Sequence, residues 1–513
     1  MKPIVIDGAS LSVREVGEAA RRGRSVRIDP GARRAVEAGR RLVDRAIAEQ
    51  RIVYGVDTGF GDLAQVSIPR EDLAALQLNL IRSHATGTGD PLDLPAVRAI
   101  LLVKANALLK GHGGVRWEVP ERLIDLLERE ILPVVPSIGS VGASGDLAPL
   151  AHLSLPLVGE GEVWWKGERR AAGEALREAG LDPLCLEPKE GLGLINGTQG
   201  ITALLTLALD GMDRTAAHAE IAAALSVDAL RGTDAAYHPA LYRARPHPGG
   251  VAAAERLRGL LAGSGIRGSH RFIRKTQDAY SIRCAPTVIG AARDVMERVR
   301  ETTEIELNSA TGNPLCFPEE DRILSGGNFH GEPVALAADF LAIAAAEVGS
   351  IAERRVARMV DPRLSGLPPY LAEEPGLHSG YMVAQYTAAA LVSENKVWCH
   401  PASVDSIPTS GNQEDHVSMG FHGARKARTV AENVKRVVAI ELILAAQGVE
   451  FLRPLRTSPR LEAAIEAIRA EVPRLMKDRP FTPDLERVLE MMNRGTILEA
   501  AGVSIGTAEN DRV

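Results

Sequence analysis

The second half of the chain is dominated by long segments that have the apolar periodicity of α-helices. Apolar residues, many of them alanine, recur every three or four positions, which places them on one face of a helix. Several segments exceed the usual length of a globular helix, and such helices gain their stability by packing against one another. The sequence therefore predicts a bundle of long helices, at residues 215–230, 287–306, 333–360, 380–398 and 416–451.

The first part of the chain has a more mixed pattern, in which short strand-like runs alternate with shorter helices. We therefore predict a mainly α fold. Residues 201–513 form a domain of long, roughly parallel and antiparallel helices, and residues 1–200 form a smaller mixed N-terminal region that carries the short strands. The two together make one functional unit. The strands are expected at 3–6, 25–29 and in a hairpin at 159–167, and the helices at 12–22, 32–50, 70–85, 94–110 and 121–131.

Composition and charge exclude several classes of protein. The 513 residues are 45% hydrophobic and 25% charged, and a net charge of -6 without a basic block argues against a nucleic-acid partner. The four cysteines are widely spaced and form no Cys-x-x-Cys pair, which excludes a disulfide framework and a zinc ribbon. The N-terminus lacks the apolar region of a signal peptide, and no apolar run reaches membrane-spanning length. We expect a cytoplasmic globular protein without a membrane partner.

A glycine-rich stretch at residues 139–150 has the composition of a loop that can react with itself. At its centre lie Ala143, Ser144 and Gly145, with further glycines before them. Glycine gives the backbone sharply folded conformations that are closed to other residues. In such a bend the Gly145 nitrogen can attack the Ala143 carbonyl with loss of water, and the Ser144 hydroxyl can leave as a second water. The product is a 4-methylidene-imidazol-5-one ring, an electrophile made from the chain.

Other interpretations of this stretch remain open on the residues alone. Loops of glycine and serine before a helix commonly cap that helix or bind an anion. A nucleophile elbow fits less well, because Asp146 stands where its last glycine would be. No Gly-Lys-Ser/Thr follows, so the stretch is not a P-loop.

Further candidate residues lie in or beside the predicted connections. Tyr54 begins a loop at residues 54–61 that contains three glycines, which predicts a mobile lid or a tight turn. His84 follows leucines at helical spacing and therefore points inward, as a core residue or as a ligand contact. The acid, acid and histidine at 414–416 are adjacent and would point in three directions on a helix. Since no zinc-type spacing of histidines or cysteines occurs either, we predict no metal site.

The order of these motifs resembles that of the aromatic amino-acid ammonia-lyase family. The stretch from Gly139 to His152 is similar to the family signature, in which the Ala-Ser-Gly forms the methylidene-imidazolone. Asp57, Ala279 and Gly312 differ from the residues that are most frequent at these positions in the family. These differences concern the fine geometry of the loops. Five further blocks stand in the family's order and spacing: 54–61, 196–198, 277–283, 326–330 and 412–419.

Two of these regions resemble the histidine-specific branch of the family, namely Ser83-His84 and the run from Gln413 to His416. An imidazole ring has two nitrogens, and burying either one unpaired costs about 1–3 kcal/mol. The resemblance therefore implies elimination of ammonia from L-histidine to give trans-urocanate, the first step of histidine degradation. Two alternatives remain: a tyrosine or phenylalanine ammonia-lyase or an aminomutase on the same cofactor, and a non-catalytic helical scaffold that keeps the fold.

The resemblance also implies roles for individual residues. Tyr54 is the expected base, on a loop that closes over the substrate, and Glu414 is the other candidate base. Arg283 is expected to hold the substrate carboxylate through a bidentate contact. Asn196 and Tyr280, with Gln277, are expected to position the carboxylate or to stabilise the charge on the imidazolone oxygen.

The resemblance implies a homotetramer whose active sites combine loops from more than one subunit, and no metal or external cofactor. Phe329 is expected to pack against the ring system. The expected catalytic residues are Tyr54, Ala143, Ser144, Gly145, Tyr280 and Glu414, and the expected substrate-binding residues are Ser83, His84, Asn196, Gln277, Arg283, Phe329 and Gln413.

Overall fold

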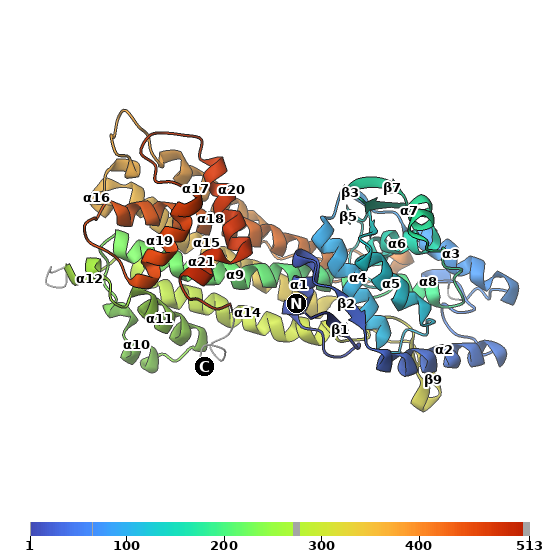
Figure 1. The fold of residues 1–513 in the computed structure, drawn as a ribbon. Coiled ribbons are helices and arrows are strands. Elements are labelled where there is room, and N and C mark those ends of the chain that lie inside the picture. The colour runs from blue at the N-terminus through green and yellow to red at the C-terminus, as the bar shows by residue number, and fades with distance from the viewer. Residues whose placement is uncertain (1, 64, 270–276, 506–513) are drawn as a thin grey trace. The chain divides into compact units, whose positions relative to one another are not determined.

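The computed structural model describes residues 2–63, 65–269 and 277–505, and it confirms a mainly α fold (Figure 1). Within these residues the sheets have only two or three strands each. The predicted division at residue 200 stays a prediction. By its own contacts the chain separates into two compact units that are interleaved in sequence: the first unit is Met1–Asp210, Val299–Asp339 and Pro401–Arg428, and the second is Gly211–Arg298, Phe340–His400 and Thr429–Val513.

The N-terminus of the first unit has the strands that the sequence predicts. β1 (Ile4–Ile6) pairs in parallel with β2 (Val26–Ile28), and α1 (Val13–Arg22) connects them. The side chain of Ser12 accepts a hydrogen bond from the backbone of Glu15, which starts α1 with a capping box. α2 (Arg33–Ala48) follows with one buried face.

The core of the first unit is built around α4 (Leu94–Leu109), which is buried along almost its whole length. A helix that is apolar all round belongs in a core. α4 packs against α1 and α5 (Glu118–Glu128), and α3 (Leu73–His84) packs against α6 (Leu147–Ser154) and α8 (Glu190–Ile195). Two polar residues of α4, Lys104 and Asn106, are nevertheless buried.

Short strands lead into the glycine-rich stretch of the first unit. β3 (Thr88–Pro91) pairs with β5 (Pro136–Ile138), which ends just before the stretch, and α6 begins just after it. A hairpin is present but extends beyond the predicted bounds of 159–167, since its strands are β6 (Glu162–Trp165) and β7 (Glu168–Ala171). β4 (Leu132–Pro133) pairs with the other edge of β6. The remaining strands are β8 (Leu315–Phe317) and β9 (Arg322–Leu324).

The long helices are present where apolar periodicity predicts them. Helix α9 begins at Gln199, where the Asn-Gly-Thr segment predicts a helix start, and it continues without a break through the segment predicted at 215–230. Its first turns carry Ile201, Leu204 and Leu205 buried on several sides, and a helix without an exposed face has no amphipathic period. The long helices are α9 (Gln199–Ala229), α14 (Ala285–Leu307), α15 (Glu332–Val360), α17 (Met382–Trp398) and α18 (Gly420–Glu450).

Shorter helices complete the fold. They are α7 (Ala172–Ala179), α10 (Pro239–Ala244), α11 (Pro248–Leu261), α12 (Gly265–Ser269), α13 (Tyr280–Arg283), α16 (Pro362–Ser365), α19 (Pro459–Glu471), α20 (Thr482–Arg494) and α21 (Thr496–Ala500).

One helix of the described residues is long and apolar enough to span a membrane by length and composition, which the sequence analysis did not expect. This helix is α15, whose most apolar window has a mean hydropathy of 1.8. The window is 67% buried inside the protein, as is usual for the core helix of a bundle. The segment was predicted as a helix at 333–360, but Asp339 and Glu347 interrupt its apolar residues, so the sequence shows no unbroken apolar run of membrane-spanning length there.

The second unit contains a fully buried ion pair that should matter for its stability. Arg355 on α15 and Glu441 on α18 are both 0% exposed, and their side chains meet through two contacts of 2.5 and 2.8 Å. The hydroxyl of Ser226 also donates to Glu441, at 2.6 Å. Removing one partner of such a pair leaves an uncompensated buried charge, which costs about 3–5 kcal/mol.

We predict that Arg355→Met clearly lowers the melting temperature in calorimetry. The matched control is Arg363→Met, because Arg363 also pairs with an acid, Asp361, but has a side chain that is 87% exposed. An exposed pair contributes about 0–1 kcal/mol. Equal melting temperatures for the two variants would show that the buried pair does not stabilise this unit.

Candidate active site

The glycine-rich stretch forms a tight bend between β5 and α6, in the first unit. Gly145 has a backbone φ of 70°, in the left-handed region that favours glycine. A methyl group added there would overlap with the backbone carbonyl of Gly197. Ala143 packs with Val417 and Met419 in a small apolar cluster. The bend is therefore shaped by close backbone approach on one side and by apolar packing on the other.

The Asn196-Gly197 segment lies directly beside the bend and is joined to it by two backbone hydrogen bonds. The Gly197 nitrogen donates to the Ser144 carbonyl oxygen at 3.3 Å, and the Asp146 nitrogen donates to the Gly197 carbonyl oxygen at 2.8 Å. Asn196 is buried, and its side-chain oxygen has no hydrogen-bond partner among the described residues. A buried polar atom in that condition is uncommon and marks a place where a ligand can bind.

Glu414 is in direct contact with the centre of the bend. The Ser144 hydroxyl donates to one carboxylate oxygen of Glu414 at 3.0 Å, and the Thr409 hydroxyl donates to the other at 2.6 Å. The backbones of Thr409 and Glu414 also pair with each other, at 3.0 and 3.3 Å. Both carboxylate oxygens of Glu414 are therefore fixed by hydrogen bonds, and one of them lies at Ser144, whose hydroxyl is predicted to leave when the ring forms.

The loop of Tyr54 lies beside the same segment. The Tyr54 hydroxyl oxygen accepts a hydrogen bond from the Gly61 nitrogen at 3.0 Å, which closes the loop on itself. Gly61 is in turn so close to Ser410 that a side chain at 61 would contact the Ser410 hydroxyl. Because Ser410 directly follows Thr409, this packing brings the Tyr54 loop to the turn that holds Glu414.

His84 ends α3 within electrostatic reach of Glu414. Its Nδ1 lies 2.8 Å from the Leu80 carbonyl oxygen and 3.1 Å from the Ser83 hydroxyl. Burial lowers the pKa of His84, while the Leu80 carbonyl and the charge on Glu414 oppose this shift. A carbonyl oxygen only accepts, so Nδ1 carries the proton and Nε2 is the acceptor of the neutral ring.

The segment that carries Phe329 lies against the segment that carries Gln413. The rings of His330 and His416 stack with centroids 5.6 Å apart, and His330 Nε2 lies 3.2 Å from the His416 carbonyl oxygen. Phe329 is half-buried and Gln413 is exposed.

These histidines also belong to a group that could hold a metal ion. Ligand atoms of His330, Glu332 and His416 lie within 4.8 Å of one another. His416 thus faces residues from another segment rather than the neighbouring acids at 414 and 415, which are the ones that the sequence analysis considered.

Two buried ionisable residues beside the bend were missed by the sequence analysis. Asp146 directly precedes α6, as a helix-starting residue should, but its side chain does not cap that helix. Instead it accepts from the Ser140 hydroxyl at 3.0 Å and from the Ile201 nitrogen at 2.7 Å. Burial raises the pKa of Asp146 to about 7. Lys104 donates to the Asn196 carbonyl oxygen, and burial lowers the pKa of Lys104 to about 7. The sequence does contain a signal for Lys104, because a lysine inside an apolar helical segment indicates a buried charge.

The remaining expected residues belong to the second unit. Tyr280 and Arg283 lie on α13, with the Arg283 guanidinium carbon 5.0 Å from the centre of the Tyr280 ring. Tyr280 is 71% exposed, and Gln277 is exposed just before it. Arg283 lines a cavity of about 290 Å³ together with Tyr242 and His247. The expected residues are thus gathered into two groups, one in each unit.

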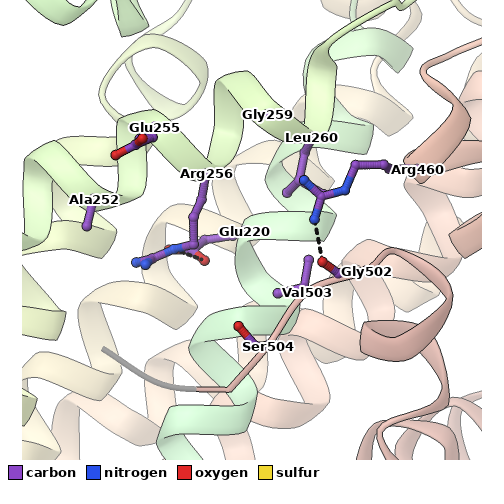
Figure 2. Close-up of a pocket in the computed structure, with 10 residues that line it drawn as sticks. All are labelled: Glu220, Ala252, Glu255, Arg256, Gly259, Leu260, Arg460, Gly502, Val503 and Ser504. Atoms are coloured by element: carbon purple, nitrogen blue, oxygen red, sulfur yellow. Dashed lines mark hydrogen bonds and ion pairs between the residues drawn. The ribbon is translucent and has the colours of Figure 1, made fainter. Parts of the chain in front are cut away.

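A second cavity of the second unit contains none of the expected residues (Figure 2). It has a volume of about 380 Å³ and is lined partly by Glu220, Arg256 and Arg460. These charges are already used within the chain. Glu220 accepts from Arg256 at 2.9 Å, and Arg460 donates to the Gly502 carbonyl oxygen at 2.6 Å. The lining does not point to a particular ligand.

Solved structures identify the class of this fold. The structure of histidine ammonia-lyase from Trypanosoma cruzi matches with a TM-score of 0.91 and 43% identity, covering 98% of this chain and 96% of that one. Tyrosine aminomutase from Streptomyces globisporus matches with a TM-score of 0.92 and 38% identity, covering 99% of this chain and 100% of that one. The chain therefore has the helical fold that these lyases and aminomutases share.

Sequence relatives then identify the family. The family model for aromatic amino acid lyases matches residues 11–470. The chain is 51% identical to histidine ammonia-lyase of Symbiobacterium thermophilum, covering 98% of this chain and 99% of the relative. It is 50% identical to histidine ammonia-lyase of Anaeromyxobacter sp. strain K, covering 96% of this chain and 99% of the relative. The chain belongs to the aromatic amino acid lyase family.

We predict that Gly145→Ala destabilises the bend and lowers the melting temperature of the protein. The methyl group would push the 143–146 backbone away from Gly197, so hydrogen–deuterium exchange at 139–147 should accelerate. Gly167→Ala is the matched control, because Gly167 also has a positive φ, of 82°, but has open space around its Cβ position. Both variants strain the backbone by about 1–2 kcal/mol, and only Gly145→Ala adds an overlap. Equal exchange at 139–147 in the two variants would contradict the close approach.

Proposed function

We propose that this chain is a histidine ammonia-lyase, which eliminates ammonia from L-histidine to give trans-urocanate. As a member of the aromatic amino acid lyase family it is a carbon–nitrogen lyase. The observation that carries the proposal is the contact between Ser144 of the Ala-Ser-Gly bend and Glu414, with His84 in electrostatic reach. The identity of about 50% to histidine ammonia-lyases over the whole chain supports the same substrate.

The residues at 143–145 fit a 4-methylidene-imidazol-5-one formed from them. Ring closure joins the Gly145 nitrogen to the Ala143 carbonyl carbon, and that carbonyl oxygen leaves as water with the amide hydrogens of 144 and 145. The Ser144 hydroxyl leaves with the Cα hydrogen of Ser144 as the second water. Gly145 lies too close to Gly197 for any side chain, which supports a compressed bend. The ring supplies an electrophilic methylene carbon that draws electrons from the substrate.

His84 and Glu414 select an imidazole over a phenyl ring in this proposal. With Nδ1–H directed at the Leu80 carbonyl oxygen, His84 Nε2 can accept a hydrogen bond from an imidazole N–H. Glu414 offers carboxylate oxygens in the same region. A phenyl ring would pair with neither group and would leave the carboxylate desolvated, which is strongly unfavourable.

Tyr54 and Glu414 are the two candidates for removing the β-hydrogen. Glu414 keeps the hydrogen bond from the Thr409 hydroxyl after the Ser144 hydroxyl has left, and the carboxylate oxygen that Ser144 occupied is then free to accept a proton. The Tyr54 hydroxyl accepts only a backbone N–H in the contacts seen at its loop. Rearrangement of the loop would release that hydroxyl for proton transfer while the loop excludes water. Arg283 would bind the substrate carboxylate in a bidentate contact, and Asn196, Tyr280 and Gln277 would hold charge beside it.

The two groups of site residues are proposed to meet in a homotetramer with shared active sites. The second unit exposes large apolar side chains on long helices, including Phe340 and Ile343 on α15 and Val383 and Tyr386 on α17. In each of these pairs the residues are three positions apart and therefore share one face of their helix. Exposed apolar faces of this kind support contact with another chain. A second copy would supply Tyr280 and Arg283 to the bend of the first.

The direct test is turnover of a panel of aromatic amino acids. L-Histidine should release ammonia and the ultraviolet-absorbing urocanate, and Ser144→Ala should fold normally but lose nearly all turnover because it lacks the leaving hydroxyl. The structural likeness to a tyrosine aminomutase makes tyrosine the informative competitor. Turnover of tyrosine with none of histidine, or a β-amino acid product on chromatography, would reassign the enzyme.

A second test addresses substrate choice. His84→Leu removes the acceptor for the imidazole N–H, and the loss of one such hydrogen bond costs about 1–3 kcal/mol, so kcat/KM for L-histidine should fall about 5–150-fold. The control is His112→Leu, since His112 is also half-buried and directs Nδ1 at a backbone carbonyl, that of Cys316, at 2.7 Å. Equal kcat/KM values in the two variants would remove His84 from the substrate site.

A further inference from the structure

Lys104 is a buried lysine whose ammonium group reaches the backbone beside the Ala-Ser-Gly bend. The residue is 2% exposed, in the middle of the apolar helix α4. Its Nζ donates to the Asn196 carbonyl oxygen at 2.9 Å and to the Gln199 side-chain oxygen at 3.2 Å. Gln199 is itself oriented by a hydrogen bond from its amide nitrogen to the Thr311 hydroxyl, at 2.8 Å. The ammonium group is therefore held in one direction, toward Asn196.

One peptide group connects this ammonium group to the bend. The carbonyl that accepts from Lys104 and the N–H of Gly197 belong to the same Asn196–Gly197 peptide. That N–H donates to the Ser144 carbonyl oxygen at 3.3 Å. Hydrogen bonds in a chain polarise one another, so a peptide whose oxygen binds a cation becomes a stronger donor through its nitrogen.

The Gly197 carbonyl group, on the other side of this residue, is held by a hydrogen bond as well. The Gly197 carbonyl oxygen accepts from the Asp146 nitrogen at 2.8 Å, so the Asn196–Gly197 peptide is prevented from rotating away from the bend. Asp146 is fully buried, and its charge favours the protonated form of Lys104, whereas burial and the nearby Lys189 oppose it by lowering the pKa of Lys104. A neutral side chain would hold the Asn196 carbonyl without the desolvation cost of a buried charge. Burial lowers the pKa of Lys104 to about 7, so the side chain carries its charge below that pH, where it binds the Asn196 carbonyl more strongly than a neutral donor would.

We propose that Lys104 is a positioning residue that acts through the Asn196–Gly197 peptide on the Ser144 carbonyl oxygen. The inference rests on the proposed function, because in the imidazolone this oxygen becomes the carbonyl oxygen of the ring. Electrons drawn into the ring collect on that oxygen, and a hydrogen-bond donor aimed at it stabilises them. Lys104 thereby orients and strengthens the Gly197 N–H without touching the substrate.

The test compares Lys104→Met with Lys104→Arg in the full-length enzyme. Ring formation is measured by the mass of the peptide that contains residues 143–145, and kcat is expressed per ring-containing chain. Loss of an oxyanion donor lowers kcat about 10²–10³-fold, so the indirect loss in Lys104→Met should be about 10–100-fold with KM for L-histidine little changed. Lys104→Arg should recover most of kcat because it keeps the charge.

Lys189→Met is the matched control, since Lys189 is also 2% exposed and buried in the first unit. Because the charge of Lys189 lowers the pKa of Lys104, removing it keeps Lys104 protonated, and kcat should stay at or above that of the wild type. Lys104→Gln keeps a neutral donor and covers a failure of Lys104→Met to fold; it too should lose kcat, because the charge is gone. Wild-type kcat in Lys104→Met or Lys104→Gln, or an equal loss in Lys189→Met, would overturn the role of Lys104. A wild-type peptide that retains both waters would instead overturn the proposed function.

Discussion

The close approach of two backbone segments, 143–146 and 196–197, is the constraint on which the site depends. Neither Gly145 nor Gly197 carries a side chain, so the segments can pair through their peptide groups. This contact fixes the direction of the Ser144 carbonyl oxygen, while Glu414 fixes the Ser144 hydroxyl on the other side. A serine held at both polar groups is prepared for a reaction that keeps its carbonyl and removes its hydroxyl.

Two buried charged residues of the first unit, Lys104 and Asp146, hold these two backbone segments in place. The mostly apolar helix α4 places Lys104 against the Asn196 carbonyl oxygen. Asp146 joins the bend to the start of α9 through the Ile201 nitrogen. Buried charges are costly unless their hydrogen bonds are satisfied. Lys104 and Asp146 contact backbone groups at or beside the bend and not solvent. The packing of the core therefore determines the geometry of the site.

The sequence predicted the mainly α fold because amphipathic helices show their period directly. It predicted a helix start at residues 194–199 and a helical segment at 215–230, but not that both belong to the single helix α9, because residues buried on several sides show no period. It correctly placed Asp146 at the start of a helix, but local spacing could not show that the side chain of Asp146 bonds to a residue 55 positions away instead of capping that helix. The contact of Ser144 with Glu414 spans 270 positions, and no local pattern shows such a pair. The family resemblance, not periodicity, named those residues together.

The central claim is that Ala143, Ser144 and Gly145 become a ring, and the intact mass of the purified chain tests it most directly. Ring closure removes two waters, so the measured mass should lie below the sequence mass by that amount, and Ser144→Ala should lack the second loss. A wild-type chain with the full sequence mass would contradict the account, because the bend would then be an ordinary turn.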